Sequence, residues 1–403
     1  MSLHNPGYNL LAFYTSAALW NVCMGTLQVL VPLYALSLGF SVLKISSIIA
    51  VPVLAEFVIR FLGSALSDRF GERRILQGCY LLMAASAAML LLAKNYPQLL
   101  SAQTIAYFSR GVFWISVQSL ASQLPGSNVG KKLGRLSACN YGGNLIGLSL
   151  GGVAAALLGY HNGFLLLTGL ALVCTLLGLA LPYVEAKPSG RTIRDITLRM
   201  GRLLRYRHIW FAISISYAAA LPPTLTQSIY PLYLAHLDYA EQWIGVVLSF
   251  RAMGAVLVGL TLGSLITLAR QRGIYALGMA SLGLFVVGSG LAENPLFLGP
   301  CIAALGAAGV IMDLLCQVQA SEWSRAHDRS VAMASMGLGW NLCPFLTPML
   351  VGWLAEVFGF RLAFLATGGF FLLMAAGTQL WHRLLMSAGP VEATRSPDLA
   401  SRY

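Results

Sequence analysis

Long apolar stretches alternate with short polar breaks along almost the whole chain. Each stretch holds roughly 20 residues, which is about the length of α-helix needed to cross the hydrocarbon core of a bilayer. The pattern therefore predicts membrane-spanning helices. Twelve spans are expected, at residues 9–36, 42–66, 75–93, 98–121, 135–158, 163–183, 209–235, 242–268, 274–292, 296–320, 331–357 and 362–381.

The composition agrees with a chain that has lipid as well as water around it. Hydrophobic residues make up 57% of the 403 residues, and charged residues make up only 10%. A soluble core of this length could not bury so much apolar surface and still leave a wettable exterior. The sequence predicts an all-α polytopic membrane protein. The opening segment MSLHNPGYN has no Lys or Arg and no cleavage pattern of small residues, so the first span is expected to stay in the mature protein.

The net charge of +12 raises the question of nucleic-acid binding, and the placement of the charges answers it. The connections on one side of the predicted membrane hold only Lys44, Lys94 and Arg361, whereas the other side and the tails hold twenty Lys or Arg. Positive residues gather on the cytoplasmic side of membrane proteins. We therefore expect both termini to be cytoplasmic, in the inner membrane of a bacterium, and no nucleic-acid partner. Glu356, near the outer end of its span, is expected to reach water.

All seven cysteines fall inside predicted spans, and none has CxxC or Cys/His spacing. Small apolar packing residues explain them. The sequence predicts no disulfide, no metal site and no cofactor.

The two halves of the chain resemble each other. QVLVPLYALSLGF, from Gln28, aligns with QSIYPLYLAHLDY, from Gln227, at an offset of 199 residues. GYHNGF, from Gly159, aligns with GFRLAF, from Gly359, at an offset of 200. Two matches with nearly the same offset predict a duplication of a six-helix unit. Repeats of this kind place a functional site at the interface between the halves.

A basic segment lies between the halves, at residues 184–208. It holds seven Lys or Arg against Glu185 and Asp195, with apolar residues at helical spacing on one face. This pattern predicts an interfacial helix on the cytoplasmic leaflet that contacts anionic headgroups, and regulatory docking is the alternative. The predicted organisation is an N-terminal six-helix bundle, a basic linker, a C-terminal six-helix bundle and a cytoplasmic tail, at residues 1–183, 184–208, 209–385 and 386–403.

The connection after the second span, GSALSDRFGERR from Gly63 to Arg74, places five charged residues within seven positions. It resembles motif A of the major facilitator superfamily, roughly G-x-L-A-D-R-x-G-R-K. The positions that match are Leu66, Asp68, Arg69, Gly71 and Arg73. The departures from the motif are Ser64, Ser67 and Glu72.

This resemblance covers the full chain, since twelve spans, two matching halves and a basic linker accompany the motif. It implies two six-helix bundles related by a pseudo-two-fold axis around a central site, which works by alternating access. In that family the motif A loop latches the halves in the outward-facing state. The resemblance implies that Asp68 is the latch, that Arg69 and Arg73 support it, and that Gly71 permits a tight turn. A role of these charges in topology alone is the alternative.

Glycines and prolines inside the spans form two further patterns. GGNLIGLSLGG in the fifth span resembles motif C of the proton-coupled antiporter branch, with Leu148 at the proline position. Its matching residues are Gly143, Gly147, Gly151 and Gly152. Such spacing also suits close helix packing in any bundle. Pro222 and Pro223 in the seventh span predict a break in its helix that serves as a gating hinge.

Five charged residues lie inside predicted spans, far from either end. A charge in hydrocarbon costs a few kcal/mol, so each should be paired or should line a watery cavity. Glu56 and Arg60 are spaced i, i+4, and Arg110, which resembles the motif B arginine, can pair with Glu56 at similar depth. We hypothesise that Glu56 carries a proton, and a static ion pair is the alternative. Arg251 and Asp313 either pair similarly, or Arg251 receives an anionic group of the substrate.

Neutral polar residues inside the spans are the candidates for a substrate cavity. Gln28 and Tyr34 in the first span are equivalent to Gln227 and Tyr233 in the seventh, and in this fold those spans line the central cavity. Such groups suit an amphipathic organic solute better than an inorganic ion. Hydrogen bonding between helices is the alternative role. The candidates are Gln28, Tyr34, Gln118, Asn144, Gln227, Tyr233, Gln317 and Asn341.

The predicted function is secondary active transport, as proton-coupled export of a small amphipathic organic molecule. The alternative is a proton symporter that imports an organic anion, which three intramembrane arginines against two deeply placed acids favour. A non-transporting sensor or an enzyme is less consistent with the sequence, which has no soluble output domain, nucleophile elbow, phosphate loop or paired catalytic His and Asp. The proton is the expected coupling ion. A monomer is expected, with a small-molecule substrate and membrane lipids as partners.

Overall fold

The computed structural model describes residues 6–124, 129–182, 207–261, 271–323 and 329–377. Within its helices, the side chains at 6–9, 61–69, 129–131, 207–209, 212, 259–261, 271–272, 317–323 and 329–336 lie outside the description. The tail predicted at 386–403 and all but the last two residues of the linker predicted at 184–208 also lie outside it. The interfacial helix and the division of the chain into these segments therefore stay predictions.

The first half of the chain forms six spans. Its helices are α1 (Pro6–Ser37), α2 (Val42–Ala50), α3 (Pro52–Phe70), α4 (Glu72–Leu92), α5 (Tyr96–Gln123) and α6 (Val129–Leu179). Only Val51 separates α2 from α3, so the two together are the second span. Within α6 the chain turns back at Gly159, whose φ of 72° suits a residue without a Cβ. The fifth and sixth spans are thus one helical run folded at a single glycine.

The second half repeats this arrangement. Its helices are α8 (Arg207–His236), α9 (Glu241–Thr261), α10 (Gln271–Leu291), α11 (Pro295–Trp323), α12 (Arg329–Phe358) and α13 (Phe360–Ala376). Gly359, with a φ of 82°, separates α12 from α13 as Gly159 divides α6. Gly39 after α1 and Asp238 after α8 also share a positive φ, of 77° and 57°. The duplication seen in the sequence is therefore repeated in the turns of the backbone.

The predicted break in the seventh span is wrong, because α8 continues through Pro222, Pro223 and Pro231. Membrane helices tolerate proline where neighbouring groups satisfy the carbonyls that lose their N–H partner. The hydroxyls of Thr224 and Thr226 donate to carbonyls in the same turns at 2.7 and 2.8 Å, although not to the two carbonyls that Pro222 and Pro223 free. These hydroxyls add hydrogen bonds to the helix beside its adjacent prolines.

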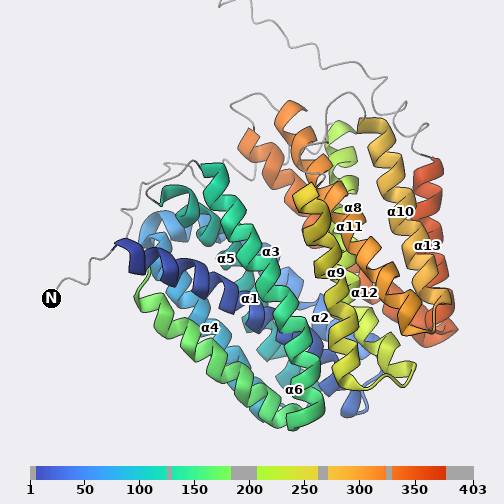
Figure 1. Cartoon of the computed structure of the whole chain (residues 1–403), viewed down its shortest axis with the longest axis horizontal. Coiled ribbons are helices and arrows are strands. Elements are labelled where there is room, and N and C mark those ends of the chain that lie inside the picture. The colour runs from blue at the N-terminus through green and yellow to red at the C-terminus, as the bar shows by residue number, and fades with distance from the viewer. Residues whose placement is uncertain (1–5, 125–128, 183–206, 262–270, 324–328, 378–403) are drawn as a thin grey trace, which may run out of the picture.

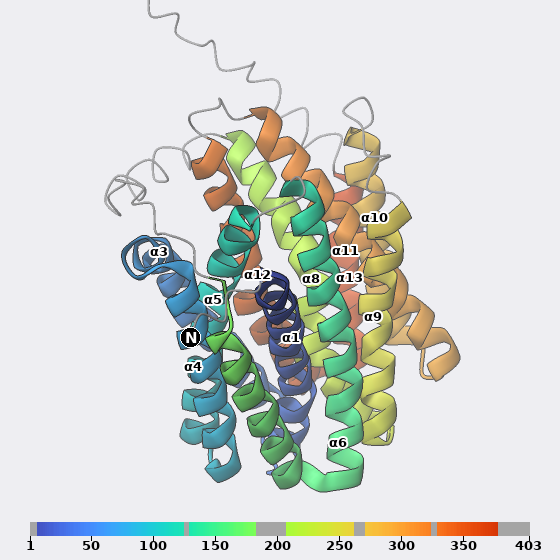
Figure 2. The ribbon, with the colours of Figure 1, turned by 60° about the vertical axis from the view of Figure 1, so that its left-hand side comes forward.

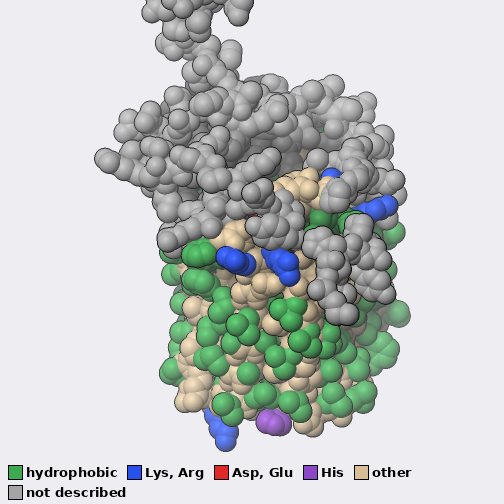
Figure 3. All heavy atoms as spheres, turned by 90° about the vertical axis from the view of Figure 1, so that its left-hand side faces the viewer, with side chains coloured by type: hydrophobic (Ala, Val, Ile, Leu, Met, Phe, Trp, Pro, Cys, Tyr) green, Lys and Arg blue, Asp and Glu red, His purple; other side chains and the backbone are tan. Residues whose placement is uncertain are grey.

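The outer surface of the protein is apolar around its flank. Figure 3 shows hydrophobic side chains over much of the described part of one face, with few Lys or Arg among them. Large side chains such as Leu157, Leu296 and Leu373 are at least 74% exposed, which a water-facing surface would not favour but lipid does. In the described chain, eight stretches are long and apolar enough to cross a membrane, and one of them, Lys132–Leu179, contains two spans.

The two halves form two bundles that lie side by side (Figure 1). They contact each other through α6 and α9, through α2 and α12, and through α1 and α8. Figure 2 shows α6 of the first half alongside α9 of the second. We call the end of the bundles that holds Gly39, Gly159 and Gly359 the far end, and the end where the halves are connected the linker end.

Candidate functional site

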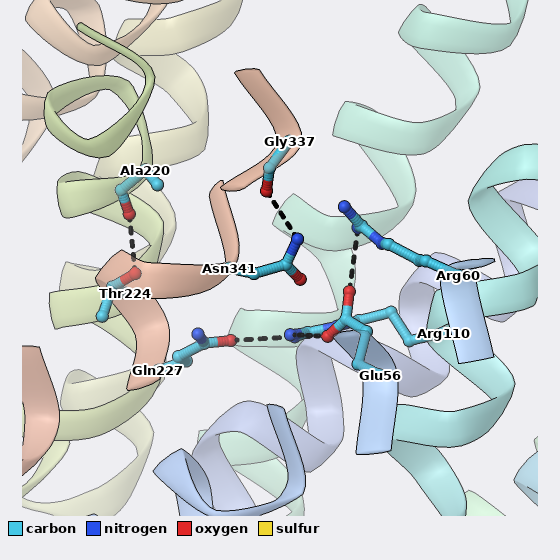
Figure 4. A network of polar contacts seen from close by, with 8 residues as sticks. All are labelled: Glu56, Arg60, Arg110, Ala220, Thr224, Gln227, Gly337 and Asn341. Atoms are coloured by element: carbon cyan, nitrogen blue, oxygen red, sulfur yellow. Dashed lines mark hydrogen bonds and ion pairs between the residues drawn. The ribbon is translucent and has the colours of Figure 1, made fainter. Parts of the chain in front are cut away.

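Three charged side chains of the first half meet where the two bundles face each other (Figure 4). Glu56 on α3 is 2% exposed and forms ion pairs with two arginines. Arg60, one helical turn later, donates to its Oε1 at 2.8 Å. Arg110 on α5 donates to its Oε2 through Nε at 2.8 Å and through Nη2 at 2.5 Å. The predicted pairing of Glu56 with both arginines is confirmed.

Arg110 also reaches the second half. Its Nη1 donates to the side-chain oxygen of Gln227 on α8 at 3.3 Å, and its guanidinium lies 4.0 Å from the centre of the Tyr107 ring. Gly111 allows α5 to approach α3 closely, because a Cβ at this position would lie 2.9 Å from the Glu56 carbonyl oxygen. Losing one partner of a buried ion pair costs several kcal/mol, so these contacts hold α3 and α5 together strongly.

A second cluster surrounds Arg251 of α9. Arg251 is 8% exposed, and its Nη2 donates to Asn144 Oδ1 on α6 at 2.7 Å. The Asn144 side-chain amide in turn donates to Gln28 Oε1 on α1 at 3.4 Å. The pairing considered for Arg251 with Asp313 is not seen, and Arg251 donates across the interface instead. Asp313 lies half-buried on α11 and has contacts of its own.

The two clusters are reciprocal. In one, Arg110 of the first half donates to Gln227 of the second. In the other, Arg251 of the second half donates to an amide of the first, which is bonded to Gln28. Gln28 and Gln227 are the repeat-equivalent glutamines predicted from the sequence, and each belongs to one cluster. Both clusters join the halves, so a change in either one acts on the contact between the bundles.

The other predicted cavity residues have different positions. Gln118 is exposed on α5, and the side chain of Gln317 lies outside the described residues. Asn341 on α12 is buried and donates to the Gly337 carbonyl of its own helix at 2.5 Å. In Figure 4 it is drawn beside the Glu56 cluster. Of these three, only Asn341 is described near the centre of the molecule.

Tyr34 and Tyr233 differ from the expectation that they line a central cavity. The Tyr34 hydroxyl donates to the Ala93 carbonyl at 2.7 Å, and the Tyr233 hydroxyl donates to the Ala292 carbonyl at 3.4 Å. Each tyrosine ring packs against two aromatic rings of its own half. Because carbonyls at helix ends lack intrahelical partners, each hydroxyl satisfies a group at the end of a neighbouring helix. Both tyrosines thus support the bundle to which they belong.

The glycines of the motif C-like stretch bring helices into backbone contact. A Cβ at Gly143, Gly147 or Gly151 would meet backbone atoms of α1. A Cβ at Gly152 would instead meet backbone atoms of α9 in the other half, where Gly245 lies against it. The prediction of close helix packing is confirmed, and it extends across the interface between the halves.

The motif A stretch is described only in part. Gly71 has a φ of 79° and separates α3 from α4, which confirms the predicted tight turn. Arg73 is half-buried and donates to the Leu179 carbonyl at the end of α6 at 2.6 Å. The side chains of Asp68 and Arg69 lie outside the described residues. The latch implied by the resemblance therefore stays a prediction.

Two contacts between the halves at the far end were missed by the sequence reasoning. Glu356 on α12 accepts a hydrogen bond from the backbone N–H of Leu43 on α2 at 2.8 Å. Tyr160, just after the turn in α6, donates to the carboxylate of Glu241 on α9. Glu356 was expected only to reach water. The sequence did contain a signal for this contact. Glu356 lies near the end of its span, and the first turn of α2 has no acid of its own to stabilise its N-terminus.

Metal-ligand residues do not cluster within the part of the chain that the structure describes, where no group of three or more His, Cys, Asp or Glu could hold a metal ion. The seven cysteines, all within the described chain, form no disulfide, and five of them are buried. Their surroundings agree with packing residues of the helices.

Two bundles of six apolar helices, joined by buried polar clusters, define an integral membrane transporter. A family model described as Major Facilitator Superfamily matches residues 11–288 and 209–399. The two matches together cover nearly the whole chain, so the chain belongs to this superfamily. The resemblance seen in motif A is confirmed at the level of the family, and the predicted fold is confirmed with it.

Comparisons with individual proteins give more distant likenesses. The chain is 24% identical over 279 residues to the Multi-drug resistance efflux pump PmrA homolog of Lactococcus lactis subsp. lactis, which covers 66% of this chain and 68% of that protein. It is 19% identical over 228 residues to the Quinolone resistance protein NorA of Staphylococcus aureus, over 56% of this chain and 58% of that protein. The solved structure of the nucleoside transporter NupG has a TM-score of 0.79 at 12% identity, over 93% of this chain and 99% of that one. This structural likeness concerns the fold alone.

Proposed function

We propose that the protein exports a small amphipathic organic solute from a bacterium in exchange for protons. The protein is taken to lie in the inner membrane with both termini in the cytoplasm, as the distribution of Lys and Arg predicts. The names of the two distant relatives, an efflux pump and a quinolone resistance protein, support export. The neutral amides of Gln28, Asn144 and Gln227 beside apolar helix surfaces suit an amphipathic solute.

The observation that carries proton coupling is the sharing of one carboxylate by two arginines, one of which also bonds to the other half. While Glu56 is ionised, it holds Arg110 in the position from which Arg110 reaches Gln227. A proton on Glu56 removes the counter-ion of Arg110 and leaves a buried cation without compensation. Arg110 must then find another partner, and the hydrogen bond between the halves changes with it.

The contacts at the far end support a mechanism of alternating access. The described contacts of Glu356 with α2 and of Tyr160 with Glu241 hold the halves together there. The same end holds the backbone contact between Gly152 and Gly245. We infer that in this state a solute reaches the central clusters from the linker end, which we take to be cytoplasmic. Export requires these far-end contacts to open and the linker end to close.

The test uses purified protein in liposomes with an imposed pH gradient and a panel of cationic, neutral and anionic aromatic solutes. Wild-type protein should move at least one solute against its gradient when protons can flow the opposite way. Glu56→Gln should abolish this pH-driven movement while leaving the protein folded. Glu293→Gln, which changes an exposed acid at the start of the loop before α11, is the matched control and should transport normally. pH-driven transport retained by Glu56→Gln would refute the role of Glu56.

Import of an organic anion with protons is the second candidate, and Arg251 is the observation that favours it. Arg251 is a buried cation at the interface and forms no ion pair with the described residues. The same liposomes separate the two functions. Export by exchange requires solute and protons to move in opposite directions, whereas symport requires both to move in the same direction.

A further inference from the structure

The two buried interface arginines differ in how their charge is compensated. Arg110 has a carboxylate at 2.5 and 2.8 Å and an aromatic ring beneath it. Arg251 has a neutral amide oxygen of Asn144 at 2.7 Å, and its Nε–H has no acceptor. Arg60 and Arg110 both form their ion pairs with Glu56. Arg251 is therefore a cation that the described protein leaves without a counter-ion.

Such an arrangement is costly unless something else completes it. An unpaired charge at membrane depth costs several kcal/mol, and a buried guanidinium N–H without an acceptor adds to that cost. Residues of this kind in transmembrane segments face bundle interiors or pathways and mark sites of function. The groups bonded to Arg251 are polar but neutral, since Asn144 is its acceptor and is itself bonded to Gln28. Tyr141 of α6 lies between the fields of Arg251 and Asp313, but Asp313 forms no ion pair with Arg251. What Arg251 lacks among the described residues is a carboxylate within ion-pair distance.

We propose that Arg251 is the subsite for a carboxylate carried by the transported solute, and that the solute is therefore an amphipathic organic acid or zwitterion. The planar guanidinium presents parallel N–H groups that match the two oxygens of a carboxylate. Asn144 accepts from one of these N–H groups, and Nε–H has no acceptor. This inference rests on the proposed transport function and adds the charge of the substrate to it.

The position of the subsite connects binding to the movement of the halves. Arg251 belongs to α9 of the second half, and Asn144 belongs to α6 of the first. A carboxylate that takes over the Arg251 N–H groups replaces a hydrogen bond between the halves with one to the solute. Binding therefore weakens one of the two central links, while the Glu56 cluster maintains the other until it is protonated.

The experiment measures binding without requiring transport. Wild-type protein in nanodiscs of pure phosphatidylcholine is titrated with 1-naphthoate and with 1-naphthamide, which share shape and differ in charge. A charge-assisted pair predicts that naphthoate binds at least ~10-fold more tightly. Arg251→Gln should reduce this preference to about 2-fold or less, and Arg361→Gln, an exposed arginine at the start of α13, should keep it. Equal binding of both probes to wild type, or a preference that survives Arg251→Gln, would overturn the proposal.

Two further arms keep the outcome decisive. Asn144→Ala removes the amide that competes for Arg251, so the preference for naphthoate should be retained or increased. This variant tests the proposal even if Arg251→Gln does not fold. Loss of the preference in Asn144→Ala would count against the guanidinium as the binding group. Addition of phosphatidylglycerol to the nanodiscs tests lipid as the source of the anion. The affinity of wild type for naphthoate should not change when this lipid is added. If the affinity of wild type falls and that of Arg251→Gln does not, the subsite would be assigned to lipid. Glu56→Gln should retain naphthoate binding, so failure of proton coupling and failure of this subsite give different results.

Discussion

Glu356 of α12 accepts a hydrogen bond from the backbone N–H of Leu43 at 2.8 Å, so a carboxylate of one half caps a helix of the other. The first turn of α2 contains no acid of its own, and the side-chain hydroxyl of its N-cap Ser41 accepts from the backbone N–H of Lys44. A negative charge near a helix N-terminus is stabilised by the unpaired N–H groups there. The carboxylate thus satisfies a group that would otherwise depend on water, and it does so only while the far end is closed.

Glu356→Ala should shift the protein toward a state in which the far end is open. Loss of a capping carboxylate typically costs about 0.5–2 kcal/mol, which corresponds to roughly a 2- to 30-fold change in the ratio of the two states. Nitroxide labels on cysteines placed at Lys94 and Arg361, in a background without native cysteines, report the separation of the halves at this end. Longer distances should gain population in Glu356→Ala. Glu293→Ala should leave the distribution unchanged, and an unchanged distribution in Glu356→Ala would show that the cap does not stabilise closure.

Gly152→Val should prevent closure of the far end. A side chain at this position would overlap backbone atoms of α9, including the Gly245 N at 2.8 Å, and backbone cannot move aside as a flexible side chain can. We expect transport to fall at least ~10-fold, because the closed state needed in each cycle is excluded. Gly142→Val is the matched control on the same helix, since a Cβ there meets nothing within 4 Å. Both variants are compared by uptake into liposomes and by yield of folded protein, and equal activity would refute the contact.

Much of the fold could be predicted from the sequence because the signal is repeated. Apolar length alone gives the spans, and the offset of about 200 residues gives the two halves. The charge pairs could be predicted because a buried charge needs a partner and helical spacing limits the choice, as for Glu56 with Arg60 and Arg110. The close packing of α6 could be predicted from glycines, which serve the same purpose in most membrane bundles.

The features that were not predicted depend on the orientation of side chains, which the spacing of residues in the sequence does not specify. Tyr34 and Tyr233 occur at equivalent positions, but whether such a side chain turns to the interface or to a neighbouring helix end depends on rotamer and packing. Pro222 and Pro223 each remove one backbone donor, but whether the helix then breaks depends on how its neighbours pack around it, which the sequence does not specify. The contact of Glu356 joins residues more than 300 positions apart, and its physical cause is a helix end in the other half.

Arg110→Lys should impair transport far more than Arg60→Lys. Arg110 uses three different nitrogens, two on Glu56 and one on Gln227, and a lysine ammonium cannot reproduce this planar geometry. Arg60 makes one described hydrogen bond to Glu56 from a side chain that is 29% exposed, and an ammonium can replace that. We expect at least a ~10-fold loss of proton-driven transport for Arg110→Lys and a loss of about 2-fold for Arg60→Lys. Similar losses in both would indicate that only the positive charge matters.

Tyr34→Phe should destabilise the protein more than Tyr233→Phe, and both should transport. The Tyr34 hydroxyl is 2.7 Å from the Ala93 carbonyl, whereas that of Tyr233 is 3.4 Å from the Ala292 carbonyl, so the first hydrogen bond is the stronger one. Its removal should lower the free energy of unfolding by about 0.5–1.5 kcal/mol, against a few tenths for the second. Thermal unfolding in detergent measures the difference, and liposome uptake measures the activity. If either variant retained its stability but lost solute binding, that tyrosine would belong to the substrate site after all.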